Sequence, residues 1–182
     1  MNLFQRRCFP QSVTVSRMAY FLFFAMIPLL LPGCSQESEP IHVEVGAQAP
    51  DFAIKDLEGN VIILSYFEKN PVILRFWETD CKFCRADTPI INVYFEKYKD
   101  KGLKVLYISA STETRERVEG FINDLDLPFP VIMDTEAKIA DMYNVILYPQ
   151  TIFLAPGRII QAIVPGGIGE AELDELVGPY LQ

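Results

Sequence analysis

Apolar and polar positions follow two different rhythms between residues 46 and 182. Short apolar, β-branched runs predict strands at 61–64, 72–77, 103–108, 129–133, 150–154 and 159–164. Apolar residues at helical spacing predict helices around 90–98, 118–125, 139–143 and 170–181. Pro128 ends the second of these helices, and Pro156-Gly157 predicts a turn between the last two strands. Strands that alternate with helices predict an α/β domain in which helices flank a sheet.

The first 33 residues have a different pattern. Three arginines and no acidic residue accompany an apolar run at 18–31, and Pro32, Gly33 and Cys34 follow it. The run is shorter than the ~20 apolar residues that a bilayer span needs, so it indicates a secretory signal. The ending resembles a bacterial lipobox, which implies cleavage before Cys34 and attachment of a lipid to it. Ordinary cleavage and an uncleaved anchor are the alternatives.

Residues 34–45 are polar, acidic and without periodicity, which predicts a short tether between a membrane and a domain at 46–182. Without the leader arginines, the mature chain keeps 13 of its 16 basic residues against 24 acidic ones, a net charge of −11. This charge disfavours nucleic acid and anionic lipid surfaces as partners. We therefore expect an exported protein, lipid-anchored in the bacterial periplasm or on the extracytoplasmic face of a membrane.

Cys81 and Cys84, in the stretch WETDCKFC, are the free thiols expected in the exported domain. A structural zinc site needs four ligands, whereas the domain offers these two thiols, and the single histidine, His42, lies far away in the tether. A purely structural disulfide across so short a loop gains little stability. Cys81 stands at a predicted helix start, where the helix dipole stabilises a thiolate. The pair is therefore predicted to be a redox-active disulfide, with no metal or other cofactor.

Further motifs accompany the cysteine pair. Phe76-Trp77 leads into the cysteines, Asp87 and Pro89 follow them, and Pro149 precedes Thr151 at a strand start. Together with Ala49-Pro50-Asp51-Phe52 at the front, they make residues 46–182 resemble the thioredoxin superfamily, in particular the membrane-anchored, extracytoplasmic thiol-disulfide oxidoreductases of the TlpA/ResA type. The resemblance implies a thioredoxin-like fold, with a central mixed β-sheet flanked by helices and an N-terminal β extension.

The resemblance also implies a substrate site opposite the cysteines. It implies that Pro149 is cis and faces the pair, and that the backbone of Tyr148 can pair with an extended substrate segment. Trp77 and Thr151 are expected to belong to the same groove, although Trp77, like Phe76, is also expected in the strand core. The alternative for Pro149 is an ordinary loop proline.

Thiolate chemistry distributes the roles within the cysteine pair. Cys81, nearest the helix start, is expected to attack a disulfide of a partner protein, and the more buried Cys84 to resolve the mixed disulfide. Asp87 is the candidate for taking or relaying the proton of Cys84. The alternative is a partly buried acid that pairs with Arg85 or Lys82.

Two residues depart from the family pattern, and one is unusual in its place. Asp80 stands where the family has an uncharged residue, and Asp87 stands where it usually has glutamate. Arg75 lies inside an apolar strand, and we expect it to reach the surface or to pair with an acid.

The charges around the pair indicate the direction of electron transfer. Glu78, Asp80 and Asp87 disfavour a thiolate, whereas Lys82 and the helix dipole favour it. No histidine stands between the cysteines. A less stable thiolate lowers the reduction potential, so we expect a reductase of protein disulfides. The resemblance implies substrates such as the haem-site cysteines of apocytochrome c or copper-site cysteines, and a membrane thiol carrier that restores the dithiol.

Two other functional classes remain open. A thiol peroxidase of the peroxiredoxin class shares the front of this fold, but RFWETDC lacks the proline and threonine motif of its peroxidatic cysteine. A copper-binding chaperone of thioredoxin fold needs a histidine near the cysteines, and His42 is badly placed for that role.

Overall fold

The computed structural model describes residues 43–181 of the chain. The predicted leader, Cys34, His42 and most of the predicted tether lie outside these residues. None of the helices between residues 43 and 181 has the length and apolar character that crossing a membrane requires. Val43 already packs against the core of the domain, and the Gly46 N–H donates to the Ile160 carbonyl at 2.8 Å.

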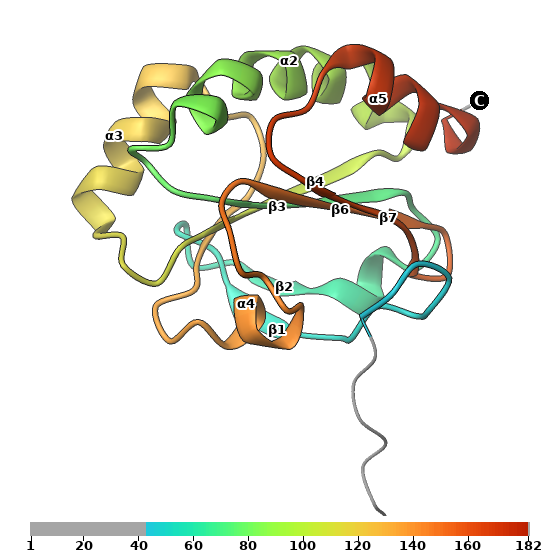
Figure 1. Cartoon of the computed structure of the whole chain (residues 1–182), viewed down its shortest axis with the longest axis horizontal. Helices are drawn as coiled ribbons and strands as arrows, with labels where there is room; N and C mark the ends of the chain where they lie inside the picture. Colours follow the sequence, from blue (N-terminus) through green and yellow to red (C-terminus); the bar gives the residue numbers. More distant parts are fainter. Residues whose placement is uncertain (1–42, 182) are drawn as a thin grey trace, which may run out of the picture. The chain divides into compact units, whose positions relative to one another are not determined.

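A five-stranded mixed sheet forms the centre of the domain, in the order β5-β4-β3-β6-β7 (Figure 1). Its strands are β3 (Val72–Trp77), β4 (Lys104–Ser109), β5 (Val131–Met133), β6 (Gln150–Ala155) and β7 (Ile159–Pro165). Strands β3, β4 and β5 run parallel, whereas β6 is antiparallel to both β3 and β7. The predicted mixed sheet is confirmed, and β3 lies in its middle.

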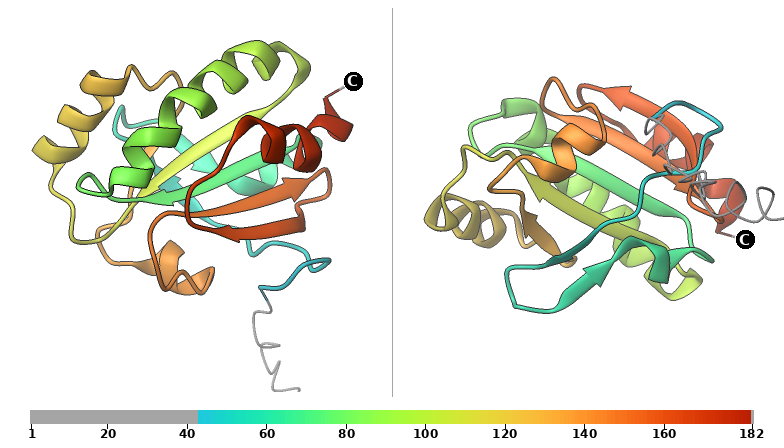
Figure 2. Two further views of the ribbon diagram at one scale, coloured as in Figure 1. Left: turned by 45° about the horizontal axis from the view of Figure 1, so that its top comes forward. Right: turned by 90° about the horizontal axis from the view of Figure 1, so that it is seen from below.

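Both faces of the sheet are covered (Figures 1 and 2). One face carries α2 (Lys82–Tyr98), α3 (Arg115–Leu125) and α5 (Glu170–Leu176). The other face carries α4 (Lys138–Met142) and a small antiparallel sheet of β1 (Ala53–Lys55) and β2 (Val61–Ile63). This two-stranded sheet is the expected N-terminal β extension.

The alternation of side chains along β3 produces the two layers. Ile73 and Trp77 are buried in the cluster beneath α2, α3 and α5, whereas Leu74 and Phe76 are buried in the cluster on the other face. By the same period of two, Arg75 shares the face of Ile73 and Trp77. Its side chain is 0% exposed. A charged group therefore lies inside the apolar layer beneath α2.

The predicted elements are present, although most of their boundaries differ from those predicted. At two of these boundaries the reason involves proline. The strand predicted at 129–133 begins only at Val131, because Pro130 has no N–H for the ladder. The helix predicted at 170–181 ends at Leu176, and the short 3-10 helix η4 (Gly178–Tyr180) follows, because Pro179 has no N–H to donate to the Glu175 carbonyl in a continued α-helix. Two further 3-10 helices follow β2 and α2, namely η2 (Leu64–Phe67) and η3 (Lys99–Lys101).

Candidate active site

The cysteine pair lies where β3 leads into α2. Strand β3 ends at Trp77, residues 78–80 connect it to α2, and Cys81 is the N-cap residue of the helix. The Cys81 sulfur accepts a hydrogen bond from the backbone N–H of Cys84 at 3.1 Å. Both thiols are free in this structure. The first N–H groups of α2, and the positive end of its dipole, are therefore directed at Cys81.

The two thiols differ in exposure and in acidity. Cys81 is 9% exposed and Cys84 is 0% exposed, so Cys84 is the more buried of the two, as predicted. Burial, followed by the hydrogen bond with Cys81, raises the pKa of the Cys84 thiol well above its ordinary value. Cys84 is therefore a protonated thiol at neutral pH, and it needs a base before it can act as a nucleophile.

Pro149 lies at the same end of the sheet as the cysteines. In the antiparallel pairing of β3 with β6, Phe76 is opposite Gln150, so the residue before β6 is close to the end of β3. The Tyr148-Pro149 peptide bond is cis, as the resemblance implied. Tyr148 is half-buried, and it makes no backbone hydrogen bond among the described residues. Its backbone groups are thus available to an added strand.

Two side chains expected in the substrate groove belong to the interior instead. Trp77 is 0% exposed, and its ring lies 4.1 Å from that of Phe121, centroid to centroid. Thr151 is also 0% exposed, and its hydroxyl accepts a hydrogen bond from Arg75. The groove position fails for both, because each side chain projects from its strand into the layer beneath α2 rather than toward solvent. The expectation that Trp77 belongs to the strand core is confirmed.

Asp87 pairs with Arg75, and not with Arg85 or Lys82 as the alternative had it. Arg75 Nη2 lies 2.5 Å from Asp87 Oδ2, and the two side chains are 0% and 6% exposed. The backbone N–H of Ile168 donates to the same carboxylate oxygen at 2.9 Å. Burial raises the pKa of Asp87, and the positive charge of Arg75 opposes this rise. The structure thus satisfies the expectation that Arg75 pairs with an acid, although the pair is deeply buried.

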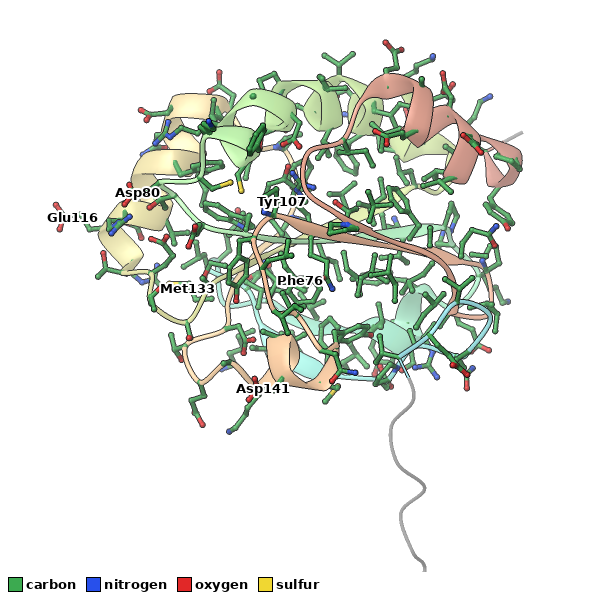
Figure 3. The ribbon with its side chains drawn as sticks, in the orientation of Figure 1. Phe76, Asp80, Tyr107, Glu116, Met133 and Asp141 are labelled. Carbon is green, nitrogen blue, oxygen red and sulfur yellow. The ribbon has the colours of Figure 1, made fainter. Side chains whose placement is uncertain are left out.

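A second polar cluster beside the cysteines was missed by the sequence analysis. The Glu113 carboxylate accepts hydrogen bonds from the Thr79 N–H at 2.8 Å and from its hydroxyl at 2.9 Å. Arg117 contacts the Thr79 hydroxyl and, at 2.6 Å, Asp80 Oδ2. Asp80 is 86% exposed, and Figure 3 shows it at the surface beside α3. The only sequence signal for this cluster is the i,i+4 spacing of Glu113 and Arg117.

Comparison with known proteins identifies the family. A sequence model of the AhpC/TSA family matches residues 45–163, a range that contains the cysteine pair and Pro149. The chain belongs to the AhpC/TSA family. Within the matched residues, the cysteine pair lies at a helix start and the cis-proline lies at the same end of the sheet.

Curated relatives of this AhpC/TSA member specify its activity. Thiol-disulfide oxidoreductase ResA of Bacillus cereus is 36% identical over 150 residues, which are 78% of this chain and 86% of that protein. Thioredoxin-like protein YneN of Bacillus subtilis is 35% identical over 136 residues, 74% of this chain and 79% of that protein. The chain is accordingly a thiol-disulfide oxidoreductase.

Solved structures confirm the thioredoxin-like fold. The thioredoxin domain of a thiol-disulfide oxidoreductase from Bacteroides vulgatus gives a TM-score of 0.67 at 23% identity, over 78% of this chain and 100% of that chain. A secreted disulfide oxidoreductase of Mycobacterium tuberculosis, described as homologous to DsbE of E. coli, gives 0.64 at 21% identity, over 70% and 95% of the two chains.

The other two functional classes gain no support from these findings. The ResA relative is named for thiol-disulfide exchange and YneN for its likeness to thioredoxin, and neither is named for peroxide reduction or copper transfer. Between residues 43 and 181, no three histidine, cysteine, aspartate or glutamate side chains are grouped so that they could hold a metal ion. Cys81 and Cys84 remain the candidate reactive groups of this site.

Proposed function

We propose that this oxidoreductase is an exported, lipid-anchored reductase of protein disulfides. The observation that carries the proposal is the difference between the two cysteines. Cys81 caps α2 and is 9% exposed, whereas Cys84 is fully buried and the pKa of its thiol is raised. A strongly oxidising pair owes its high potential to a stabilised reduced form. Burial of Cys84 withholds that stabilisation from one thiolate, which favours the disulfide and makes the dithiol a reductant.

The reaction proceeds by two exchanges. The Cys81 thiolate attacks one sulfur of a partner disulfide, and the other partner sulfur departs as a thiolate and takes up a proton. Cys84 then loses its proton and attacks the Cys81 sulfur, which forms the Cys81-Cys84 bond and breaks the bond to the partner. The partner gains two electrons and two protons. A membrane thiol carrier returns two electrons to the oxidised pair.

The partner is proposed to lie against the segment before the cis-proline. The backbone of Tyr148 has no internal partner among the described residues, so it can hold an extended segment as an added strand. Exposed apolar side chains stand nearby in the sequence, Phe83 between the cysteines and Ile146 and Leu147 before Tyr148. They suit apoprotein segments that are still unfolded, such as the haem-site cysteines of apocytochrome c or the copper-site cysteines of an oxidase.

The predicted leader and tether are the basis for proposing that this reaction takes place outside the cytoplasm. Cys34 is proposed as the lipidated residue, with residues 34–45 as the tether. The M. tuberculosis neighbour is described as secreted, which agrees with an extracytoplasmic site of action. Mass spectrometry of the purified full chain tests the anchor, because it distinguishes a diacylated Cys34 from a free N-terminus and from an uncleaved leader.

The reduction potential of the Cys81-Cys84 pair decides between reductase and oxidase. We expect a reduction potential close to that of thioredoxin, about −270 mV, and well below that of DsbA, about −120 mV. The domain without its leader is equilibrated against a dithiothreitol series, and the thiols are counted by alkylation. A potential close to that of DsbA contradicts the proposed direction, and a pair that does not titrate contradicts redox function altogether.

Asp87 is proposed to accept the proton of Cys84. The two residues are three positions apart on α2, which places them on one face of the helix, and both are buried. We expect Asp87→Asn to slow the attack by Cys84 about 10²-fold at neutral pH, a typical contribution of one general base. Stopped-flow reaction with 5,5′-dithiobis(2-nitrobenzoate) measures this step, because the first thionitrobenzoate reports attack by Cys81 and the second reports attack by Cys84.

The pH dependence of that second phase shows whether a carboxylate takes part in the attack by Cys84. Asp87 accepts a proton only as a carboxylate, so the rate falls as the pH falls through its pKa, which burial raises above the ordinary 3.8. This fall in rate at low pH, the acid limb of the profile, is expected to be absent from the Asp87→Asn variant. Its rate then depends on hydroxide alone, because the pKa of Cys84 is itself raised. An unchanged acid limb in Asp87→Asn removes Asp87 from the mechanism.

A further inference from the structure

Arg75 occupies a place where a charge is expensive. It lies in the middle of the central strand, between β4 and β6, and its side chain is 0% exposed among the apolar residues beneath α2. A buried guanidinium costs several kcal/mol of desolvation unless its surroundings compensate for the charge and occupy its donors. The contacts of this side chain therefore show what the charge is for.

Those contacts come from three other parts of the chain. One Arg75 terminal nitrogen, Nη2, donates to Asp87 Oδ2 on α2 at 2.5 Å. The other, Nη1, donates to the Thr151 hydroxyl on β6 and, at 3.3 Å, to the carbonyl of Gly166 after β7. The guanidinium is thus fixed from two sides by groups that cannot change their charge, and its remaining partner is the carboxylate.

The carboxylate of Asp87 is held by one oxygen only. Its Oδ2 accepts from Arg75 and from the Ile168 N–H, whereas its buried Oδ1 has no hydrogen-bond partner among the described residues. A buried acceptor without a partner is uncommon. Because Oδ2 is occupied, a proton that reaches Asp87 is most readily accepted at Oδ1.

We propose that Arg75 is a positioning residue for the proton transfer from Cys84, which keeps Asp87 ionised inside the protein and leaves its Oδ1 as the free acceptor. This inference deepens the proposed function and rests on the proton role of Asp87 stated there. It explains why an arginine stands in the apolar strand that precedes the redox pair.

The charge balance of the transfer supports this role. Before it, the positive Arg75 is balanced by the negative Asp87 while Cys84 is neutral. After it, the proton is on Asp87 and the negative charge is on the Cys84 sulfur, so the same guanidinium balances the thiolate. Arg75 lowers the pKa of both groups, in opposition to burial. The buried region therefore stays neutral in total at each stage, which avoids the cost of an unpaired internal charge.

The other titratable groups around Asp87 do not replace Arg75. On its own helix these are Cys84 and Cys81, and from β4 Tyr107 faces the same layer (Figure 3). Burial raises the pKa of Tyr107, so it stays a neutral phenol, and its hydroxyl lies 3.1 Å from that of Thr88. The Thr151 hydroxyl from β6, and the Gly166 carbonyl and Ile168 N–H from the segment after β7, carry no charge. Arg75 is the positive charge in this layer.

The test is the pH profile of the second thionitrobenzoate phase. We expect Arg75→Gln to move its acid limb to higher pH by about one to three units, the range over which a neighbouring arginine lowers the pKa of an aspartate. Arg75→Lys keeps the charge with poorer geometry, so its limb moves less. Arg115→Gln is the matched control, because it removes an exposed arginine that pairs with Glu119, and we expect no shift.

The same experiment separates this inference from the proposed function. If Asp87→Asn removes the limb and Arg75→Gln leaves it in place, the role of Asp87 stands and that of Arg75 is overturned. If Asp87→Asn keeps the limb, both fail. The double variant Arg75→Gln/Asp87→Asn is expected to lack the acid limb, as Asp87→Asn does, and an acid limb that persists in the double variant contradicts an action through Asp87.

A measurement on the unaltered protein covers the case in which Arg75→Gln does not fold. Carbon-13 NMR of the aspartate carboxyl groups in the reduced domain follows the ionisation of Asp87 directly, with Asp87→Asn to identify its signal. We expect a carboxylate at neutral pH in spite of its burial. A protonated Asp87 at neutral pH overturns the proposal.

Discussion

Replacing Cys81 with serine is expected to lower the rate of disulfide reduction by at least about a thousandfold, because the attacking sulfur is lost and a hydroxyl cannot take its place. Cys84→Ser is expected to have a different result. Its Cys81 still attacks, but nothing resolves the product, so the partner stays covalently attached. Reduction of insulin measures the turnover of both variants, and mass spectrometry detects the attached partner.

The exposure of the two sulfurs decides which variant forms the adduct. Cys81 caps α2 and is 9% exposed, whereas Cys84 is 0% exposed and cannot meet a partner without a structural change. A stable adduct on Cys84 in the Cys81→Ser variant therefore contradicts the order of the two exchanges. The double serine variant is the control, and any turnover that survives in it does not come from this pair.

Replacing Asp87 with leucine is expected to lower the free energy of unfolding by about 3–5 kcal/mol, because it leaves the Arg75 charge buried and uncompensated. Restoring an apolar layer reverses this loss. The double variant Arg75→Met/Asp87→Leu is expected to be about as stable as the original protein, or more stable, as found when buried ion pairs are replaced by packed apolar residues. Urea unfolding of the reduced domain measures all three proteins.

An exposed pair provides the matched control for this stability cycle. Arg85 and Asp124 are 3.3 Å apart, with side chains 44% and 62% exposed, so Asp124→Leu is expected to cost less than about 1 kcal/mol. An equal loss in Asp124→Leu and Asp87→Leu contradicts the importance of burial. A double variant that is no more stable than Asp87→Leu shows that the loss does not come from the unpaired arginine.

The parts of the site that the sequence predicted are those that depend on local order. Cys81 at a helix start, Cys84 one turn later and Pro149 before a strand follow from neighbours in the chain, and the structure places each there. The same holds for β3, whose predicted boundaries at 72–77 are those observed.

The parts that it missed depend on which residues meet across the fold. The period of two along β3 could place Arg75 beneath α2. Its pairing with Asp87 depends on how α2 packs over the sheet, whereas local spacing pointed to Arg85 or Lys82 as the partner of Asp87. Trp77 and Thr151 were expected in the groove because they adjoin its motifs in sequence. Adjacency does not say which face of a strand a side chain occupies, and both face inward.

The segment after β7 contributes to the buried pair through its main chain alone. The Gly166 carbonyl meets Arg75 and the Ile168 N–H meets Asp87, while the Gly166 N–H reaches the Pro149 carbonyl at 2.7 Å. Every residue except proline carries these groups, so substitutions at the exposed position 167 can accumulate without loss of these bonds, whereas Ile168 is also buried in the core and the φ of +91° at Gly166 favours glycine. An insertion or deletion of one residue here displaces all three bonds at once. Among homologous sequences, this segment should therefore vary in composition but hardly in length.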